Sequence, residues 1–164
     1  MGRWEDARPD STWAERTRIL ASYIPVGASV LEFGAWTMEL KRHLPPLCTY
    51  TPSDLFYRGK GTIVCDLNGP ELPVFPKHDV AVFGGVLEYV EDCERLFSHL
   101  STCVDVILAS YAASSGGDCV FRRDCQWVNS YTPYELMAML HRAGFKRSVE
   151  LTRWKGQSIV WAGE

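Results

Sequence analysis

Short apolar runs alternate with amphipathic segments along this chain of 164 residues. Apolar runs of four to eight residues bounded by turn residues are typical of strands buried in a parallel sheet. Segments whose apolar residues recur every three or four positions predict helices with one buried face. On this pattern we expect strands over residues 29–33, 48–51, 62–65, 79–83, 104–110, 145–152 and 158–162, and helices over 13–24, 37–44, 91–100 and 132–144.

The order of these elements predicts an α/β domain that closes with an antiparallel pair of strands. One feature of the order is unusual. The segments between the second, third and fourth strands are too short for crossover helices, which need a dozen residues or more. Either these connections are reduced to turns, or one of the short strands is wrongly assigned.

Several helix ends carry local signals. Thr12 followed by Glu15 is a capping box that predicts the start of the first helix, and Pro25 follows its expected end. Pro133 after Thr132 is typical of a first helical position.

The length predicts one domain over residues 1–164. Within it, residues 1–25 form an N-terminal helical segment. Residues 112–130 break the periodic pattern and are expected to form a long loop over a cleft, since loops of this length are usually functional or disordered.

Composition excludes several classes of protein. Hydrophobic residues make up 46% of the chain and charged residues 23%, with a net charge of −3 and no basic cluster, which argues against a nucleic-acid partner. The apolar runs are too short to insert into a membrane. Residues 1–10 lack the apolar core of a signal peptide, so we expect a cytoplasmic protein. The six cysteines form no C-x-x-C pair, and no metal site is predicted.

The most informative stretch is 30–38, where an apolar strand runs into a tight turn that opens the next helical segment. Open α/β sheets bind nucleotide-like cofactors at such a turn. Gly34 stands at the first glycine position of the turn, but Trp36 stands where a second glycine is expected and Met38 where a third could stand. A side chain at Trp36 opposes the backbone angle and close ligand approach that glycine permits. The indole either packs on the following helix and leaves a pocket open, or fills that pocket.

From about residue 26 to 163 the chain resembles the class I S-adenosylmethionine-dependent methyltransferases. No single motif is specific, but their order and spacing are typical of that family. The motifs are the strand and turn 30–35, the acid Asp54 after the second strand, the acidic stretch 64–67, the strand and turn 79–90, and the helix start 131–136 with the turn 143–145. The resemblance implies a Rossmann-like, seven-stranded, mostly parallel sheet with a C-terminal antiparallel pair and helices on both faces.

The resemblance also implies S-adenosylmethionine as cofactor and a set of residues that bind it. Glu32 would lie near the amino-acid part of the cofactor, Asp54 would bind the ribose hydroxyls, and Asp66 would accept from the adenine amine, with Leu67 donating through its backbone. The stretch Phe83 to Gly85 would lie beside the transferable methyl group. The complete expected cofactor set is Glu32, Phe33, Gly34, Ala35, Asp54, Asp66, Leu67, Phe83, Gly84 and Gly85.

No catalytic residue can be assigned from the sequence. Glu88, Tyr89 and Tyr131 are candidates for proton transfer, and the pair Arg122-Arg123 is a candidate anion clamp. Each has an ordinary alternative, such as helix capping for Glu88, core packing for Tyr89 and solvation for the arginines. Trp127 lies in the long loop, where a lid could press on an apolar acceptor.

Two hypotheses follow. The first is methyl transfer from S-adenosylmethionine to a small-molecule or sugar- or lipid-linked acceptor, with a protein partner or a homodimer left open. The second is a non-catalytic binding or scaffolding module whose pocket is occluded by Trp36. Nicotinamide-dependent redox chemistry is disfavoured because the G-x-G-x-x-G spacing is absent.

Overall fold

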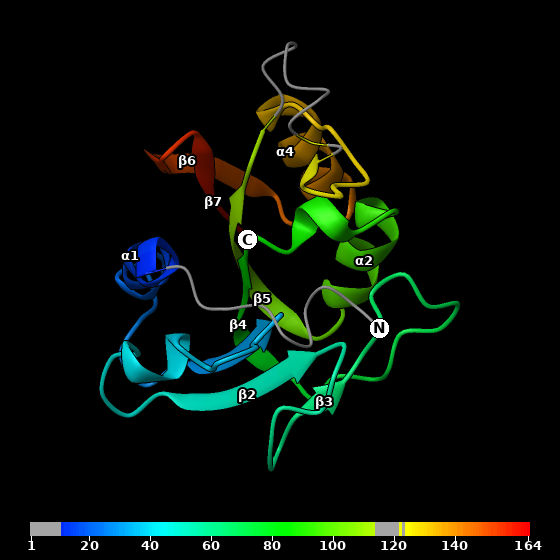
Figure 1. Cartoon of the computed structure of the whole chain (residues 1–164). Helices are drawn as coiled ribbons and strands as arrows, with labels where there is room; N and C mark the ends of the chain where they lie inside the picture. The colour runs from blue at the N-terminus through cyan, green and yellow to red at the C-terminus, as the bar shows by residue number, and fades with distance from the viewer. Residues whose placement is uncertain (1–10, 114–121, 123) are drawn as a thin grey trace.

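The fold is a single twisted sheet covered by helices on both faces (Figure 1). The computed structural model describes residues 11–113, 122 and 124–164. The sheet has seven strands in the order β3-β2-β1-β4-β5-β7-β6. Its strands are β1 Ser29–Phe33, β2 Thr49–Asp54, β3 Ile63–Val64, β4 His78–Gly84, β5 Val104–Tyr111, β6 Arg147–Trp154 and β7 Gln157–Gly163. The described helices are α1 Ser11–Ala21, α2 Cys93–Leu100 and α4 Pro133–Arg142, with short 3-10 turns η1 Leu40–Arg42 and η2 Leu87–Tyr89.

Strand directions confirm the predicted fold class. Strands β1 to β5 pair in parallel, whereas β7 runs antiparallel to both β5 and β6. The carboxyl ends of the parallel strands therefore share one edge of the sheet. The turn between β6 and β7 reaches the same edge, because Tyr111 at the end of β5 pairs with Ser158 at the start of β7.

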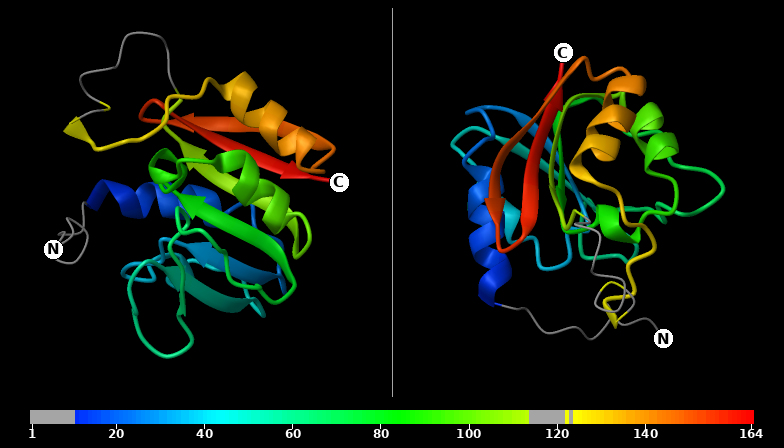
Figure 2. Two further views of the ribbon diagram at one scale, coloured as in Figure 1. Left: turned by 90° about the vertical axis from the view of Figure 1, so that its right-hand side faces the viewer. Right: turned by 90° about the horizontal axis from the view of Figure 1, so that it is seen from above.

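Successive residues of each central strand serve two separate cores, because side chains alternate across a sheet. In β1, Val30 joins a core built with α1, and Leu31 joins a core built with α2 and α4. Figure 2 shows α1 against one face of the sheet and the other two helices against the opposite face. Both faces are covered, which explains why these strands read as continuous apolar runs.

The chain caps two helices as local rules predict. Thr132 and Glu135 form a reciprocal capping box at α4, with Pro133 at its first turn. Helix α2 begins two residues later than expected, because the Asp92 side chain accepts a hydrogen bond from the Arg95 N–H and caps it. The cap of this helix is therefore Asp92, and the capping role considered as an alternative for Glu88 is not the one it has.

Besides shifts of one or two residues at the ends of other elements, three predicted elements differ from the structure. The helix expected over 37–44 is only the single 3-10 turn η1, because Trp36 and Met38 have left-handed φ angles of 38° and 55°, which interrupt a right-handed helix. Strand β2 extends to Asp54 through Pro52, which occupies a paired position opposite Glu32. Helix α1 begins at Ser11 and ends at Ala21, so Thr12 lies inside the helix rather than at its cap.

The short connections are loops. Residues 55–62 join β2 to β3 and residues 65–77 join β3 to β4 without a helix, and β3 itself has two residues. The first of the two explanations, trimmed crossovers, is therefore correct. No helix in the described parts of the chain is long and apolar enough to span a bilayer. Of the loop predicted over 112–130, residues 114–121 and Arg123 lie outside the described residues.

Candidate functional site

A cavity of about 610 Å³ opens at the edge of the sheet where the parallel strands end. This is the position at which open α/β sheets hold ligands. One half of the wall follows β1, β2 and β3, and the other half follows β4, β5 and the turn between β6 and β7. The volume lies within the range of small-molecule sites.

The turn after β1 forms the centre of the wall. Gly34 has a φ of 67°, and a methyl group added to its Cα would lie 2.5 Å from the Val86 side chain, so only glycine fits there. Trp36 has a left-handed φ of 38°, which glycine adopts freely and which costs another residue about 1 kcal/mol. Its indole packs edge-to-face on Trp13 of α1, with ring centroids 5.5 Å apart. The indole therefore lines the cavity without filling it.

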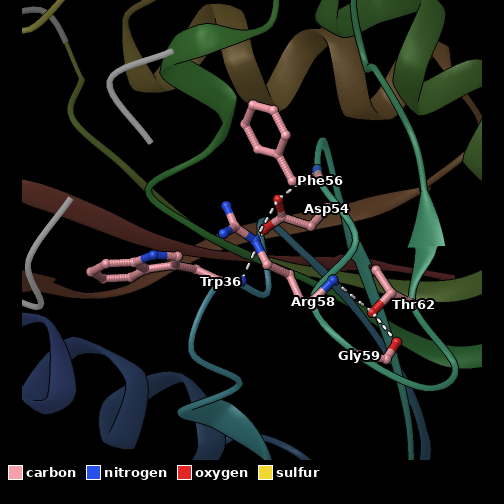
Figure 3. Close-up of polar contacts among 6 residues, drawn as sticks. All are labelled: Trp36, Asp54, Phe56, Arg58, Gly59 and Thr62. Atoms are coloured by element: carbon pink, nitrogen blue, oxygen red, sulfur yellow. Dashed lines mark hydrogen bonds and ion pairs between the residues drawn. The ribbon is translucent and has the colours of Figure 1, made fainter. Parts of the chain in front are cut away.

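Asp54, the last residue of β2, is the most heavily hydrogen-bonded carboxylate of the site (Figure 3). Its Oδ2 accepts from the Trp36 N–H at 2.9 Å. Its Oδ1 accepts from the Phe56 N–H at 3.0 Å and from Arg58 Nε at 3.0 Å. The carboxylate thus ties the turn after β1 to the loop after β2, and Figure 3 shows the Trp36 indole extending away from it.

Arg58 is held in place by its own loop. Its N–H donates to Thr62 Oγ1, and the Thr62 hydroxyl in turn donates to Gly59 O at 2.8 Å. The guanidinium also lies 5.3 Å from the Phe56 ring centre. A cation therefore stands at the carboxylate that the resemblance assigns to ribose.

The adenine-side motif forms a tight turn after β3. Asp66 accepts from the Asn68 N–H at 2.9 Å, so part of its hydrogen-bonding capacity serves the turn itself. Arg95 of α2 donates to Leu67 O at 3.0 Å, and Asn68 donates to Tyr89 O at 2.8 Å. The turn is fixed against α2 and η2 and presents Asp66 at the cavity wall.

An arginine from α1 lies against the end of β4. Arg16 Nη2 donates to Gly84 O at 2.8 Å, and its Nη1 lies 3.5 Å from Gln157 Oε1. Gly85 has a φ of 69°, and a methyl group there would come within 2.4 Å of Arg16 Nη1. Arg16 is itself buried, with 8% of its surface exposed, and its guanidinium lies 5.8 Å from the rings of Trp13 and Trp154.

Glu88 supplies a buried carboxyl group on the β4–β5 side of the cavity. Its Oε1 accepts from the Ala112 N–H at 2.7 Å, and its Oε2 has no hydrogen-bond partner within the described residues. Burial raises the pKa of Glu88, while the hydrogen bond from Ala112 and the charges of Arg16 and Arg122 oppose the rise.

Arg122 fixes the described end of the long loop. It donates to Ala112 O at 2.6 Å, to Asn129 O at 2.7 Å and to the Tyr111 hydroxyl at 3.2 Å. Trp127 lies under its guanidinium at 4.9 Å and donates to the Tyr89 hydroxyl at 3.1 Å. The polar groups of Arg122 are thus largely used by the protein, which makes it a brace for this wall more than an open anion clamp.

The structure brings most of the expected cofactor residues to one cavity. Those that line it are Phe33, Gly34, Asp54, Asp66, Leu67, Gly84 and Gly85. Ala35 and Phe83 are buried next to it, and Phe83 stacks on Phe33 with ring centroids 4.6 Å apart. Tyr131 packs near Tyr111, outside the cavity wall.

Glu32 also lies behind the wall. Its carboxyl group accepts a hydrogen bond from the Tyr50 hydroxyl. Burial raises the pKa of Glu32 from 4.5 to about 8, the negative charge of Asp54 adds to the rise, and the Tyr50 hydrogen bond opposes it. A carboxyl group of this kind is largely protonated near neutral pH.

Sequence reasoning did not identify Arg16, Arg58, Trp13 or Lys155 as site residues, although all four line the cavity. One signal was present. Arg16 precedes Leu20 and Ile24 at spacings of four and so lies on the apolar face of the predicted helix. Charged residues are rarely buried without a polar or charged partner, so this position indicates a polar contact. Arg58 and Lys155 lie in turns whose approach to the cavity only the tertiary structure defines. Among the described residues, no group of three His, Cys, Asp or Glu side chains is placed to hold a metal ion.

Comparison with solved structures gives the class of fold that this sheet and site define. A candidate O-methyltransferase from Nostoc punctiforme superposes with a TM-score of 0.74 at 16% identity, over 93% of this chain and 57% of that one. The N-terminal domain of EvdMO1, solved with S-adenosylhomocysteine (SAH) and D-fucose, gives 0.67 at 17% identity, over 96% and 84%. The 1,6-didemethyltoxoflavin N1-methyltransferase of Burkholderia thailandensis, solved with 1,6-didemethyltoxoflavin and SAH, gives 0.66 at 18% identity, over 98% and 80%.

These similarities establish the class I methyltransferase fold for this chain. The chain spans little more than half the length of the Nostoc protein. No model of a protein family matches the sequence, and the comparison with curated proteins finds no match.

Proposed function

We propose that this protein transfers a methyl group from S-adenosylmethionine to a small-molecule or sugar- or lipid-linked acceptor. The observation that carries the proposal is the cavity at the carboxyl edge of the sheet, which is lined by the Gly34 and Gly85 turns and by the carboxylates of Asp54 and Asp66. The two neighbours solved with SAH have the same fold, which supports this cofactor.

The residues present fit such a cofactor. Gly34 lines the cavity without a side chain of its own, and Asp66 at the wall would accept a hydrogen bond from an adenine amine. A carboxylate has about four lone-pair positions, and protein donors take three of them at Asp54. A ribose hydroxyl would use the remaining position or replace Arg58.

S-adenosylmethionine supplies an electrophilic methyl group on a sulfonium centre. The protein's part in an in-line displacement is to align the acceptor and exclude water. Gly84 and Gly85 line the cavity after β4, and Trp127 and Tyr89 line it where the indole N–H donates to the Tyr89 hydroxyl. We propose that the cofactor binds along the β1–β3 half and the acceptor along the β4–β7 half.

Isothermal titration of the purified protein with SAH and S-adenosylmethionine tests the proposal. Micromolar binding is the expected result and justifies an acceptor screen. A folded protein that binds neither ligand at millimolar concentration would favour the alternative, a methyltransferase-like binding or scaffolding module without cofactor.

Substitution of Trp36 tests whether its indole limits the space for the cofactor. Trp36→Gly is expected to raise affinity for SAH severalfold, because glycine accepts the left-handed φ of 38° without strain and removes the indole from the wall. Trp36→Ala is the matched control, since it removes the indole but keeps the strain. Unchanged affinity in both folded variants would show that the indole already lies outside the cofactor's position.

A further inference from the structure

The second half of the cavity has a distinct charge that points to the chemistry of its ligand. Four charged side chains line it, namely Arg16 from α1, Glu88 after β4, Arg122 after β5 and Lys155 at the β6–β7 turn. Three are cationic, although the whole chain carries a net charge of −3. The local charge therefore opposes the overall charge.

The acidic member of the group is compensated within the protein. Glu88 is 1% exposed and lies within electrostatic reach of Arg16 and Arg122. The guanidinium of Arg122 donates to backbone carbonyl groups and to the Tyr111 hydroxyl. Arg16 and Lys155 are the two other cations that line this half of the cavity.

Arg16 and Lys155 converge from opposite ends of the sequence. Arg16 reaches the cavity from α1, where its guanidinium donates to Gly84 O and lies beside Gln157. Lys155 occupies the turn two residues before Gln157, and its Nζ lies 5.2 Å from the Trp154 ring centre. No acidic side chain of the described residues forms an ion pair with Lys155.

Flat apolar surface accompanies these cations. Trp13, Tyr89 and Trp127 line the cavity together with Arg16 and Lys155. Aromatic walls beside a guanidinium and an ammonium suit a planar ring that carries a negative group, since the rings stack and the cations hold the charge.

We propose that this half of the cavity binds a planar aromatic acceptor bearing an anionic group such as a carboxylate, with Arg16 and Lys155 as its cationic partners. The inference rests on the proposed function only in calling this ligand the methyl acceptor. Binding of the anion itself does not require the cofactor, so the two are tested separately.

The test compares benzoate with benzamide, its neutral analogue of the same shape, by ligand-observed NMR titration with and without saturating SAH. Benzoate is expected to bind about tenfold more tightly than benzamide, and the advantage is expected to shrink as salt rises. Lys155→Asn is expected to remove most of this advantage, because asparagine tolerates the left-handed φ of 43° at that position but carries no charge. Lys146→Asn, at an exposed lysine outside the cavity, is the control and is expected to change nothing.

Arg16→Met removes the buried cation and is also expected to reduce the preference for benzoate. If this variant does not fold, Lys155→Asn alone tests the proposal. Equal binding of benzoate and benzamide by the unaltered protein would overturn the proposal, as would a benzoate preference that survives Lys155→Asn. If the unaltered protein prefers benzoate but does not bind SAH, the proposed cofactor is refuted and the anion site is not.

Discussion

Asp54→Asn is expected to weaken SAH binding by about tenfold or more, since hydrogen bonds to an ionised acceptor are worth about 1.5–3 kcal/mol. The carboxylate lies at the end of β2, on the cavity wall, where the resemblance places the ribose. The amide keeps one acceptor oxygen and cannot serve both the protein donors and a ribose hydroxyl. Isothermal titration of the folded variant measures the effect.

Arg58→Met is the control that separates binding from support of the loop. It removes the guanidinium that lies 3.0 Å from Asp54 Oδ1 but leaves the carboxylate. If ribose competes with Arg58 for that oxygen, Arg58→Met leaves SAH affinity unchanged or raises it. Equal weakening by both substitutions would mean that the ion pair only shapes the loop and that Asp54 does not contact the cofactor.

Glu32 is expected to make the protein lose stability as pH rises from about 5 to 8. Its pKa is about 8 in the folded state against 4.5 as the ordinary value, mainly because the group is buried. Below pH 4.5 both states hold the proton. Between the two values the unfolded chain releases its proton while the folded protein retains it, so the free energy of unfolding falls. The loss is on the order of 3 kcal/mol and levels off above pH 8.

Glu32→Gln is the comparison for this prediction. Glutamine is neutral at every pH and can still accept from the Tyr50 hydroxyl, so the variant is expected to lose this part of the pH dependence. Urea unfolding at pH 5 and pH 8 gives the two free energies for each protein. The same difference between the two pH values in both proteins would show that Glu32 does not hold its proton in the folded state.

The fold was largely predictable because its signals are local. Both faces of the central strands are covered, which produces apolar runs such as 104–110 that need no partner to be recognised. The start of α4 follows from Thr132, Pro133 and Glu135 within one turn. The prediction over 37–44 was wrong because two left-handed residues, Trp36 and Met38, reduce the expected helix to one 3-10 turn. A periodicity of apolar residues carries no information about φ.

The site was predictable only in part. Gly34, Asp54 and Asp66 follow strand ends, and the carboxyl ends of parallel strands share an edge, so their convergence could be expected. Glu32 precedes the turn by two residues, yet its side chain faces Tyr50 behind the wall. Neighbouring positions on a strand point to opposite faces, and which face bears the cavity depends on what packs there.

The sequence by itself determined the order of strands and helices, the glycine turn after β1 and the acids at the strand ends, since each depends on residues close together in the chain. Only the tertiary structure decided that the Trp36 indole packs on Trp13, that Arg58 pairs with Asp54, and that Arg16 and Lys155 meet at one cavity. The contact of Trp36 with Trp13 and the meeting of Arg16 with Lys155 join residues far apart in sequence. The Asp54–Arg58 pair depends on how its loop folds back. In each case the energy comes from packing and charge in the assembled fold, and no local pattern encodes it.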